Sequence, residues 1–214
     1  AGDVPGGIKR FAHEVVLILG LIGLIFWLAA LLSYSQQDAA WSTSGAINAT
    51  ATARNWGGRA GAWLADASYF LFGFSVWWML AAGSRVWLVS LARWMRGQSP
   101  ASTVPSLSSR LMFWVCLLLL LVASSGLEWS RLYRFESRLP DHAGGALGFV
   151  VGIAGVKWLG FAGSGLVLIA LGVIAVSNVF GFSWAHTAQS VGESIANLLD
   201  ARREKREIAQ DQAA

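Results

Sequence analysis

Residues 15–32 read VVLILGLIGLIFWLAALL, an apolar run that contains no charged side chain. A membrane-spanning helix needs roughly 20 apolar residues to cross a hydrocarbon core about 30 Å thick, and this run is close to that length. Three more uncharged runs follow at residues 67–84, 111–127 and 158–182. Because a helix satisfies its own backbone hydrogen bonds inside lipid, we expect an all-α integral membrane protein with four transmembrane helices.

The composition supports a membrane protein and excludes several other classes. Of the 214 residues, 55% are hydrophobic and only 13% are charged, whereas an average soluble domain carries about 25% charged residues. Cys116 is the single cysteine, so no disulfide can form within the chain. The three histidines, His13, His142 and His186, are far apart in sequence. We therefore expect no disulfide scaffold, no metal site and no cofactor site.

The distribution of Lys and Arg predicts that both chain ends face the cytoplasm, because cytoplasmic loops are enriched in these residues. With the N-terminus inside, ten of the 16 Lys and Arg residues fall on the cytoplasmic side, against six outside. The ten are Lys9, Arg10, Arg85, Arg93, Arg96, Arg110, Arg202, Arg203, Lys205 and Arg206. This bias agrees with an even number of spans.

A further apolar stretch at residues 143–156 is too short for a fifth span. A fifth span would also move the basic cluster at residues 202–206 to the outside, against the charge rule. We therefore expect a short re-entrant or interfacial helix before the fourth span. After that span, Val191, Ile195, Leu198 and Leu199 recur at helical spacing, which predicts an amphipathic helix.

These patterns divide the chain into three parts. We expect a cytoplasmic N-terminus, a four-helix membrane domain, and the amphipathic and charged start of a cytoplasmic linker. The N-terminus comprises residues 1–14, the membrane domain residues 15–184, and the start of the linker residues 185–214. Within the membrane domain, the spans are expected at about 15–34, 63–84, 111–127 and 158–182, and the outer loops at 35–62 and 128–157.

A ridge of small residues is a candidate packing surface. Gly144, Gly148 and Gly152 are spaced by four, so on a helix they share one face. Such a ridge lets a second backbone approach closely inside a membrane, either within the fold or between subunits. The alternative is a loosely helical hairpin, because glycine weakens helices in water.

Charged residues near the ends of the spans are candidate interaction sites. Asp66 lies at the outer mouth of the second span and Lys157 at the border of the fourth, and both favour structural anchoring over an ion relay. Residues 128–141, which begin with Glu128, are the most charged part of the predicted exterior. On a helix, Arg131, Arg134 and Arg138 would share a face. That face is either a solvated stripe or a docking patch for a partner protein.

No catalytic signature is present. The sequence lacks a phosphate-binding loop, a nucleophile elbow and the Cys or His spacing of a zinc site. We therefore expect a non-enzymatic domain, with a pore or transporter-like channel as the alternative. A membrane-embedded enzyme, the third possibility, would need converging polar side chains within the spans.

Four short stretches of the sequence carry a resemblance to a known family. They are SYSQQDAAWS at 33–42, NWGGRAGAWLAD at 55–66, GGALG at 144–148 and GFSW at 181–184. Together they resemble the N-terminal four-helix membrane domain of FtsK-type bacterial DNA translocases (the FtsK/SpoIIIE family). Residues 55–66 match the family pattern Asn-x-x-Gly-x-x-Gly-Ala through Gly58 and Gly61, and include Asp66. The family usually has a Pro-containing stretch in the first loop, whereas no Pro follows Asp38 here.

The resemblance implies more than the residues show. Full-length members carry a cytoplasmic linker and a hexameric ATP-driven motor that pumps DNA during septum closure, and this sequence contains no such motor. By resemblance, the chain is a membrane anchor and scaffold for cell division and chromosome partition, at the septum of the bacterial inner membrane. Its implied partners are membrane lipid, other division proteins and copies of itself in a homo-oligomer such as a hexamer. DNA and ATP would be partners only through the absent motor.

Overall fold

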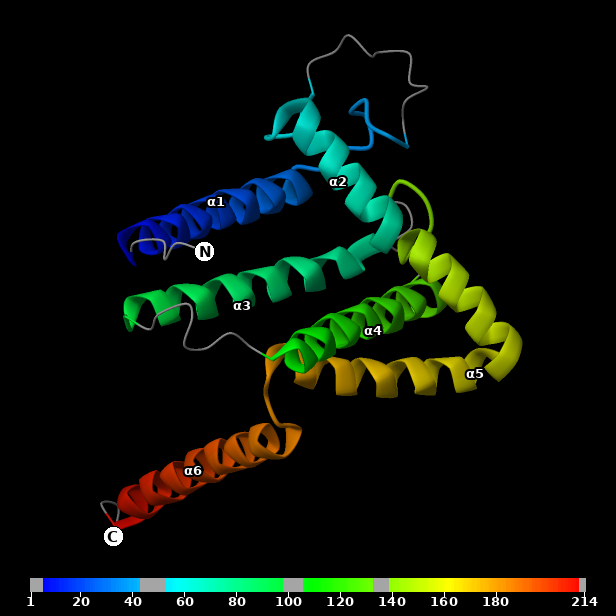
Figure 1. The fold of residues 1–214 in the computed structure, drawn as a ribbon. Coiled ribbons are helices and arrows are strands. Elements are labelled where there is room, and N and C mark those ends of the chain that lie inside the picture. Colours follow the sequence, from blue (N-terminus) through cyan, green and yellow to red (C-terminus); the bar gives the residue numbers. More distant parts are fainter. Residues whose placement is uncertain (1–5, 43–52, 98–105, 133–138, 212–214) are drawn as a thin grey trace. The chain divides into compact units, whose positions relative to one another are not determined.

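The computed structural model describes residues 6–42, 53–97, 106–132 and 139–211, and every regular element among them is a helix (Figure 1). The elements are α1 (Gly6–Leu32), α2 (Gly58–Phe72), the 3-10 turn η1 (Gly73–Ser75), α3 (Val76–Met95), α4 (Leu107–Arg131), α5 (Gly145–Phe180) and α6 (Trp184–Asp211). Four segments are long and apolar enough to cross a membrane: Arg10–Leu32, Gly58–Met95, Leu107–Arg131 and Gly145–Phe180. The predicted all-α membrane fold is confirmed.

The second apolar segment, which contains the span expected at residues 63–84, is not one straight helix. The chain changes direction at η1, so this segment is divided between α2 and α3 (Figure 1). Gly73 has φ of +57°, a backbone conformation that side chains with a Cβ rarely adopt. A Cβ at this position would also lie only 2.6 Å from the backbone of Gly144. The break is therefore fixed by backbone geometry and by a tertiary contact.

A second break divides α5 at Gly160, where φ is +67° and ψ is 176°. Residues 145–159, which include most of the expected short helix, form the first half of α5. They span about 22 Å at 1.5 Å per residue, less than the thickness of a bilayer core. Residues 161–180 span about 30 Å, which is long enough to cross it.

The helices pack with their neighbours in opposite directions. Trp87 of α3 donates a hydrogen bond from Nε1 to the carbonyl of Leu17 in α1, at 2.8 Å. A Cβ at Gly83 would lie 3.2 Å from Leu24, which is nearer the other end of α1. These contacts make α1 and α3 antiparallel, as Figure 1 shows. In the same way, the second half of α5 runs antiparallel to α4, with Leu168 beside Gly126.

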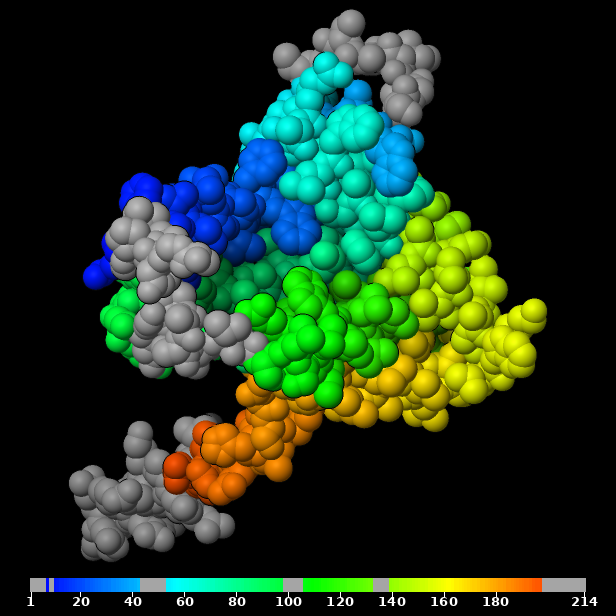
Figure 2. Space-filling view, in the orientation of Figure 1, coloured from blue at the N-terminus to red at the C-terminus, as the bar shows by residue number. Residues whose placement is uncertain are grey.

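The main core lies where α1 ends, α2 passes and α3 begins. It is built from Ala30, Leu31, Ala65, Tyr69, Val76, Leu139 and Ala143. Much of the remaining apolar surface faces outward: on α1, Val16, Ile18 and Leu19 are between 60% and 64% exposed. In Figure 2 the side chains of α1 (blue) and α4 (green) are open on the face that is drawn. Burial of such side chains in lipid is favourable, so a bilayer is their matching solvent.

Residues 180–214 form a separate unit. Its helix α6 continues through the charged segment to Asp211. Val191 and Ile195, four residues apart, are each 53% exposed. The amphipathic pattern predicted from the sequence thus falls on a helix.

Candidate functional site

Asp66 is the centre of a buried polar cluster in α2. Its side chain is fully buried. Its carboxylate accepts hydrogen bonds from the backbone N–H of Ser42 at 2.7 Å, the Ser42 hydroxyl at 2.6 Å and the Tyr34 hydroxyl at 3.2 Å. A buried charge is stable only when such donors replace water. Asp66 therefore fastens the chain after α1 onto α2.

The Tyr34 hydroxyl stays protonated and therefore remains a hydrogen-bond donor in this cluster. Burial, together with the negative charge of Asp66, raises the pKa of Tyr34 well above its ordinary value. The phenol stays neutral, so its proton remains available to the carboxylate. The Tyr34 ring also packs on Tyr69, with ring centroids 5.0 Å apart.

A second buried carboxylate, Asp38, organises the approach to α2. It accepts from the backbone N–H groups of Arg54 at 2.8 Å and Asn55 at 2.9 Å. The Asn55 side chain in turn donates to the carbonyl of Ala30 at 2.8 Å. Asp38 and Asn55 together hold this segment against the end of α1.

The glycines of the motif at residues 55–62 have different roles. A Cβ at Gly61 would overlap the side-chain oxygen of Asn55, so only glycine leaves room for Asn55 to reach α1. Gly58 has φ of +61° at the start of α2, and an added Cβ there would have open space around it. Gly61 is therefore needed for close packing and Gly58 for backbone conformation.

Glu128, near the end of α4, is the most important residue that the sequence analysis missed. It was grouped with the exposed charges of residues 128–141, but it is 8% exposed. Its carboxylate accepts from the backbone N–H of Phe74 at 2.9 Å and from the Ser75 hydroxyl. The first N–H groups of a helix have no partner within the helix, and a carboxylate satisfies them well. Glu128 thus stabilises the start of α3 at the η1 break.

The glycine ridge packs on α4 of the same chain. A Cβ at Gly144 or Gly148 would overlap the carbonyl oxygen of Ser125, and one at Gly152 would overlap the ring of Trp129. All three glycines are therefore in contact with one face of α4. This is the intrachain arrangement of the two that the spacing allowed.

Arg131 turns toward α5. Its guanidinium lies 3.5 Å from the ring centroid of Phe161 and donates to the Phe161 carbonyl at 2.6 Å. This contact comes immediately after the Gly160 break, so it joins α4 to the second half of α5. Arg134 and Arg138 lie outside the described residues, and the arginine stripe predicted with Arg131 stays a prediction.

The three buried carboxylates hold neighbouring segments of the chain together. We define the carboxylate end as the end of the helices that contains Asp38, Asp66 and Glu128. Each of these carboxylates is engaged by donors of the chain itself. Within residues 6–42, 53–97, 106–132 and 139–211, no three His, Cys, Asp or Glu side chains are grouped to hold a metal ion.

Comparisons with known proteins agree with this membrane architecture. A family described as the 4TM region of DNA translocase FtsK/SpoIIIE matches residues 9–192. DNA translocase FtsK 2 of Ralstonia nicotianae is 35% identical over 211 residues, covering 98% of this chain and 26% of that protein. DNA translocase FtsK 1 of Neisseria meningitidis serogroup A is 28% identical over 198 residues, covering 92% and 24%. The chain spans about a quarter of the length of these curated relatives. No solved structure matches it significantly.

Proposed function

The chain belongs to the family of the 4TM region of FtsK/SpoIIIE DNA translocases, and from this premise we propose that it is a non-catalytic membrane anchor and division scaffold. It would hold a septal DNA translocase in the bacterial inner membrane during cell division and chromosome segregation. The relatives that it matches are named DNA translocases, and the match covers only their membrane region.

The strongest support is the way polar and apolar side chains are used. The buried carboxylates Asp66 and Glu128 bind donors of neighbouring segments, so they serve the fold. Apolar side chains cover the outside of the helices, where they can face lipid. A domain built in this way anchors what is attached to it and offers its loops to partners.

We propose that both chain ends face the cytoplasm. The arginine end, defined by Arg93, Arg96 and Arg110, lies opposite the carboxylate end along α3 and α4. The positive-inside rule places the arginine end in the cytoplasm. The first half of α5 then lies on the outer side, as an interfacial or re-entrant helix.

Partners follow from the same orientation. We expect other division proteins to meet the charged outer segment that contains Arg134 and Arg138. The motor of a full-length translocase would connect through the segment after α6. DNA and ATP would bind to that motor and not to the membrane domain. A homo-oligomer, such as a hexamer, would follow from assembly of the motor, of the membrane domain or of both.

Complementation tests this function. When the native membrane domain is depleted in cells, this domain, fused to a fluorescent protein, should gather at the division site and restore viability. A variant with the outer segment changed, Arg134→Ala with Arg138→Ala, should keep its membrane insertion but lose septal enrichment. Uniform distribution around the membrane without rescue by the unchanged domain would contradict the proposal.

A pore or transporter-like channel is the second candidate, with Asp66 and Lys157 as its ionisable groups. The hydrogen bonds around Asp66 disfavour it, because three donors already occupy that carboxylate. Lys157 is exposed. Ion flux through reconstituted liposomes that disappears in Asp66→Asn would favour the channel instead.

A further inference from the structure

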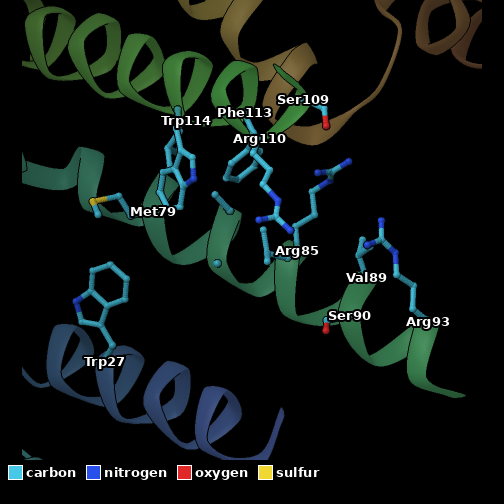
Figure 3. Close-up of a pocket in the computed structure, with 14 residues that line it drawn as sticks. Trp27, Met79, Arg85, Val89, Ser90, Arg93, Ser109, Arg110, Phe113 and Trp114 are labelled. Carbon is cyan, nitrogen blue, oxygen red and sulfur yellow. The ribbon is translucent and has the colours of Figure 1, made fainter. Parts of the chain in front are cut away.

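An open groove of about 710 Å³ lies between α1, α3 and α4 (Figure 3). One part of it is apolar and aromatic, and the other part carries three arginines. Figure 3 shows Arg85 on α3 and Arg110 on α4 with their side chains reaching into the space between the two helices, and Arg93 farther along α3. None of the buried carboxylates described above lines this groove.

The arginines lack negative charges of their own. Residues 67–127 contain no Asp or Glu. In the part of the chain that the structure describes, no carboxylate forms an ion pair with Arg85, Arg93 or Arg110. Arg85 lies in the middle of α3, about 15 Å from Met95 at 1.5 Å per residue. Arg85 thus lies inside the apolar segment Gly58–Met95, where a cation is costly unless an anion or water reaches it.

The rest of the groove has the opposite chemistry. Trp27, Met79 and Phe113 line it from α1, α3 and α4. They form an apolar channel beside the arginines, and Ser90 and Ser109 add hydroxyl groups near the charged part. A matching ligand therefore has an anionic head that accepts hydrogen bonds and a hydrocarbon tail. A free phosphate or a nucleic acid would leave the apolar part empty.

We propose that this groove binds an anionic phospholipid. Its phosphate lies between Arg85 and Arg110, with Arg93 nearer the membrane surface, and one acyl chain lies along Trp27 and Phe113. The guanidinium groups donate to the phosphate oxygens, as arginine does at other phosphate sites. Basic pockets between transmembrane helices suit such lipids. The proposal needs the membrane fold but not the septal role, so the two can fail separately.

Lipid binding to the purified full chain tests the charged part. Native mass spectrometry would compare dioleoyl phosphatidylglycerol with dioleoyl phosphatidylcholine, which has no net charge. We expect preferential retention of phosphatidylglycerol, and a loss of affinity of about fivefold for Arg85→Gln and again for Arg110→Gln. Arg96→Gln is the matched control, because Arg96 is exposed at the same end of α3 but does not line the groove. Equal retention of both lipids, or equal loss in all three variants, would overturn the proposal.

A second variant tests the apolar part without changing charge. Val86 lines the groove and is 50% exposed, so Val86→Trp should fill the space meant for the acyl chain. We expect weaker phosphatidylglycerol binding with unchanged helical circular dichroism and melting temperature. Soluble glycerol phosphate at millimolar concentration should not displace the lipid. Displacement by glycerol phosphate would indicate a simple anion site, and disulfide cross-linking between two Val86→Cys copies in a Cys116→Ala background would indicate a protein occupant. Either result would overturn a lipid site.

Discussion

Glu128 and Asp66 are acidic side chains whose hydrogen-bond donors come from the protein and not from water. Each carboxylate is buried and accepts hydrogen bonds from segments distant in sequence. Asp66 binds the loop after α1, and Glu128 binds η1, immediately before α3. In both cases the buried acidic side chain joins segments that are far apart in sequence, so its loss should weaken a tertiary contact and not only a local helix.

Glu128→Gln should lower stability. The amide oxygen can still accept from the Phe74 N–H, but the NH₂ group cannot accept from the Ser75 hydroxyl, which must rotate and accept instead. Weakening the hydrogen bonds of a buried polar group costs about 1–3 kcal/mol. Denaturant unfolding in detergent, followed by circular dichroism, measures the difference. Glu14→Gln is the control, since the pair of Glu14 with Arg10 is exposed. Equal unfolding curves for the two variants would contradict the stabilising role of Glu128.

Gly148→Leu should disrupt the contact between α4 and α5. The new side chain would overlap the Ser125 carbonyl, and overpacking of this kind costs about 3 kcal/mol. Gly23→Leu provides a matched control, because a Cβ at Gly23 would have nothing within 4 Å. Leu118→Ala, at an exposed α4 position, should also have little effect. Thermal melting in detergent measures all three, and similar melting temperatures would mean that the glycine ridge makes no tight contact.

The raised pKa of Tyr34 predicts that the free energy of unfolding decreases at alkaline pH. Its pKa is raised in the folded state from the ordinary value of 10.0, so the unfolded chain releases the phenolic proton first. Stability should therefore be complete below about pH 10 and fall above it, by up to 1.36 kcal/mol per pH unit for this group. Tyr34→Phe should flatten the fall between pH 10 and 11.5. An unchanged slope in that variant would show that folding does not raise the pKa of Tyr34.

At the scale of helices, hydropathy predicted the apolar segments well, and the breaks could not be predicted. A membrane-spanning helix must match the thickness of the hydrocarbon core, so its apolar run has a characteristic length that can be counted in the sequence. Gly73 and Gly160, in contrast, stand in apolar runs where a straight helix is equally consistent with the pattern. The break at Gly73 depends on a tertiary contact with Gly144, and the break at Gly160 depends on a positive φ that the hydropathy pattern does not reveal. Glu128 was missed for the same reason, because its partners exist only once α3 begins at the break.

Gly160→Ala tests the second break. No atom lies near an added Cβ, so the cost is backbone strain alone, about 1–3 kcal/mol. We expect α5 to straighten, which would lengthen the distance between spin labels at Val150 and Ile174, both exposed positions. Pulsed electron paramagnetic resonance spectroscopy in a Cys116→Ala background measures that distance. Gly163→Ala, at a glycine with ordinary backbone angles, should leave it unchanged. An identical distance in both variants would mean that α5 bends without help from Gly160.

At the scale of the whole molecule, the two ends of the helices differ in charge. The carboxylate end holds its acids in internal hydrogen bonds. At the arginine end, Arg10 pairs with Glu14, whereas Arg93 and Arg110 have no acidic partner in the described part of the chain. This asymmetry is what a membrane protein needs to orient itself, since cations are retained on the cytoplasmic side. The same asymmetry leads to the proposed lipid groove, because unpaired arginines within an apolar helix attract anionic headgroups.

The location of loops relative to the membrane tests the central claim most directly. In a Cys116→Ala background, single cysteines at Arg96, Ser190 and Trp56, which are all exposed, would be treated with a membrane-impermeant maleimide on intact spheroplasts. Four spans with both ends inside predict labelling of Trp56→Cys at once, and of Arg96→Cys and Ser190→Cys only after permeabilisation. Labelling of Arg96→Cys and Ser190→Cys from opposite sides of the membrane would contradict the account.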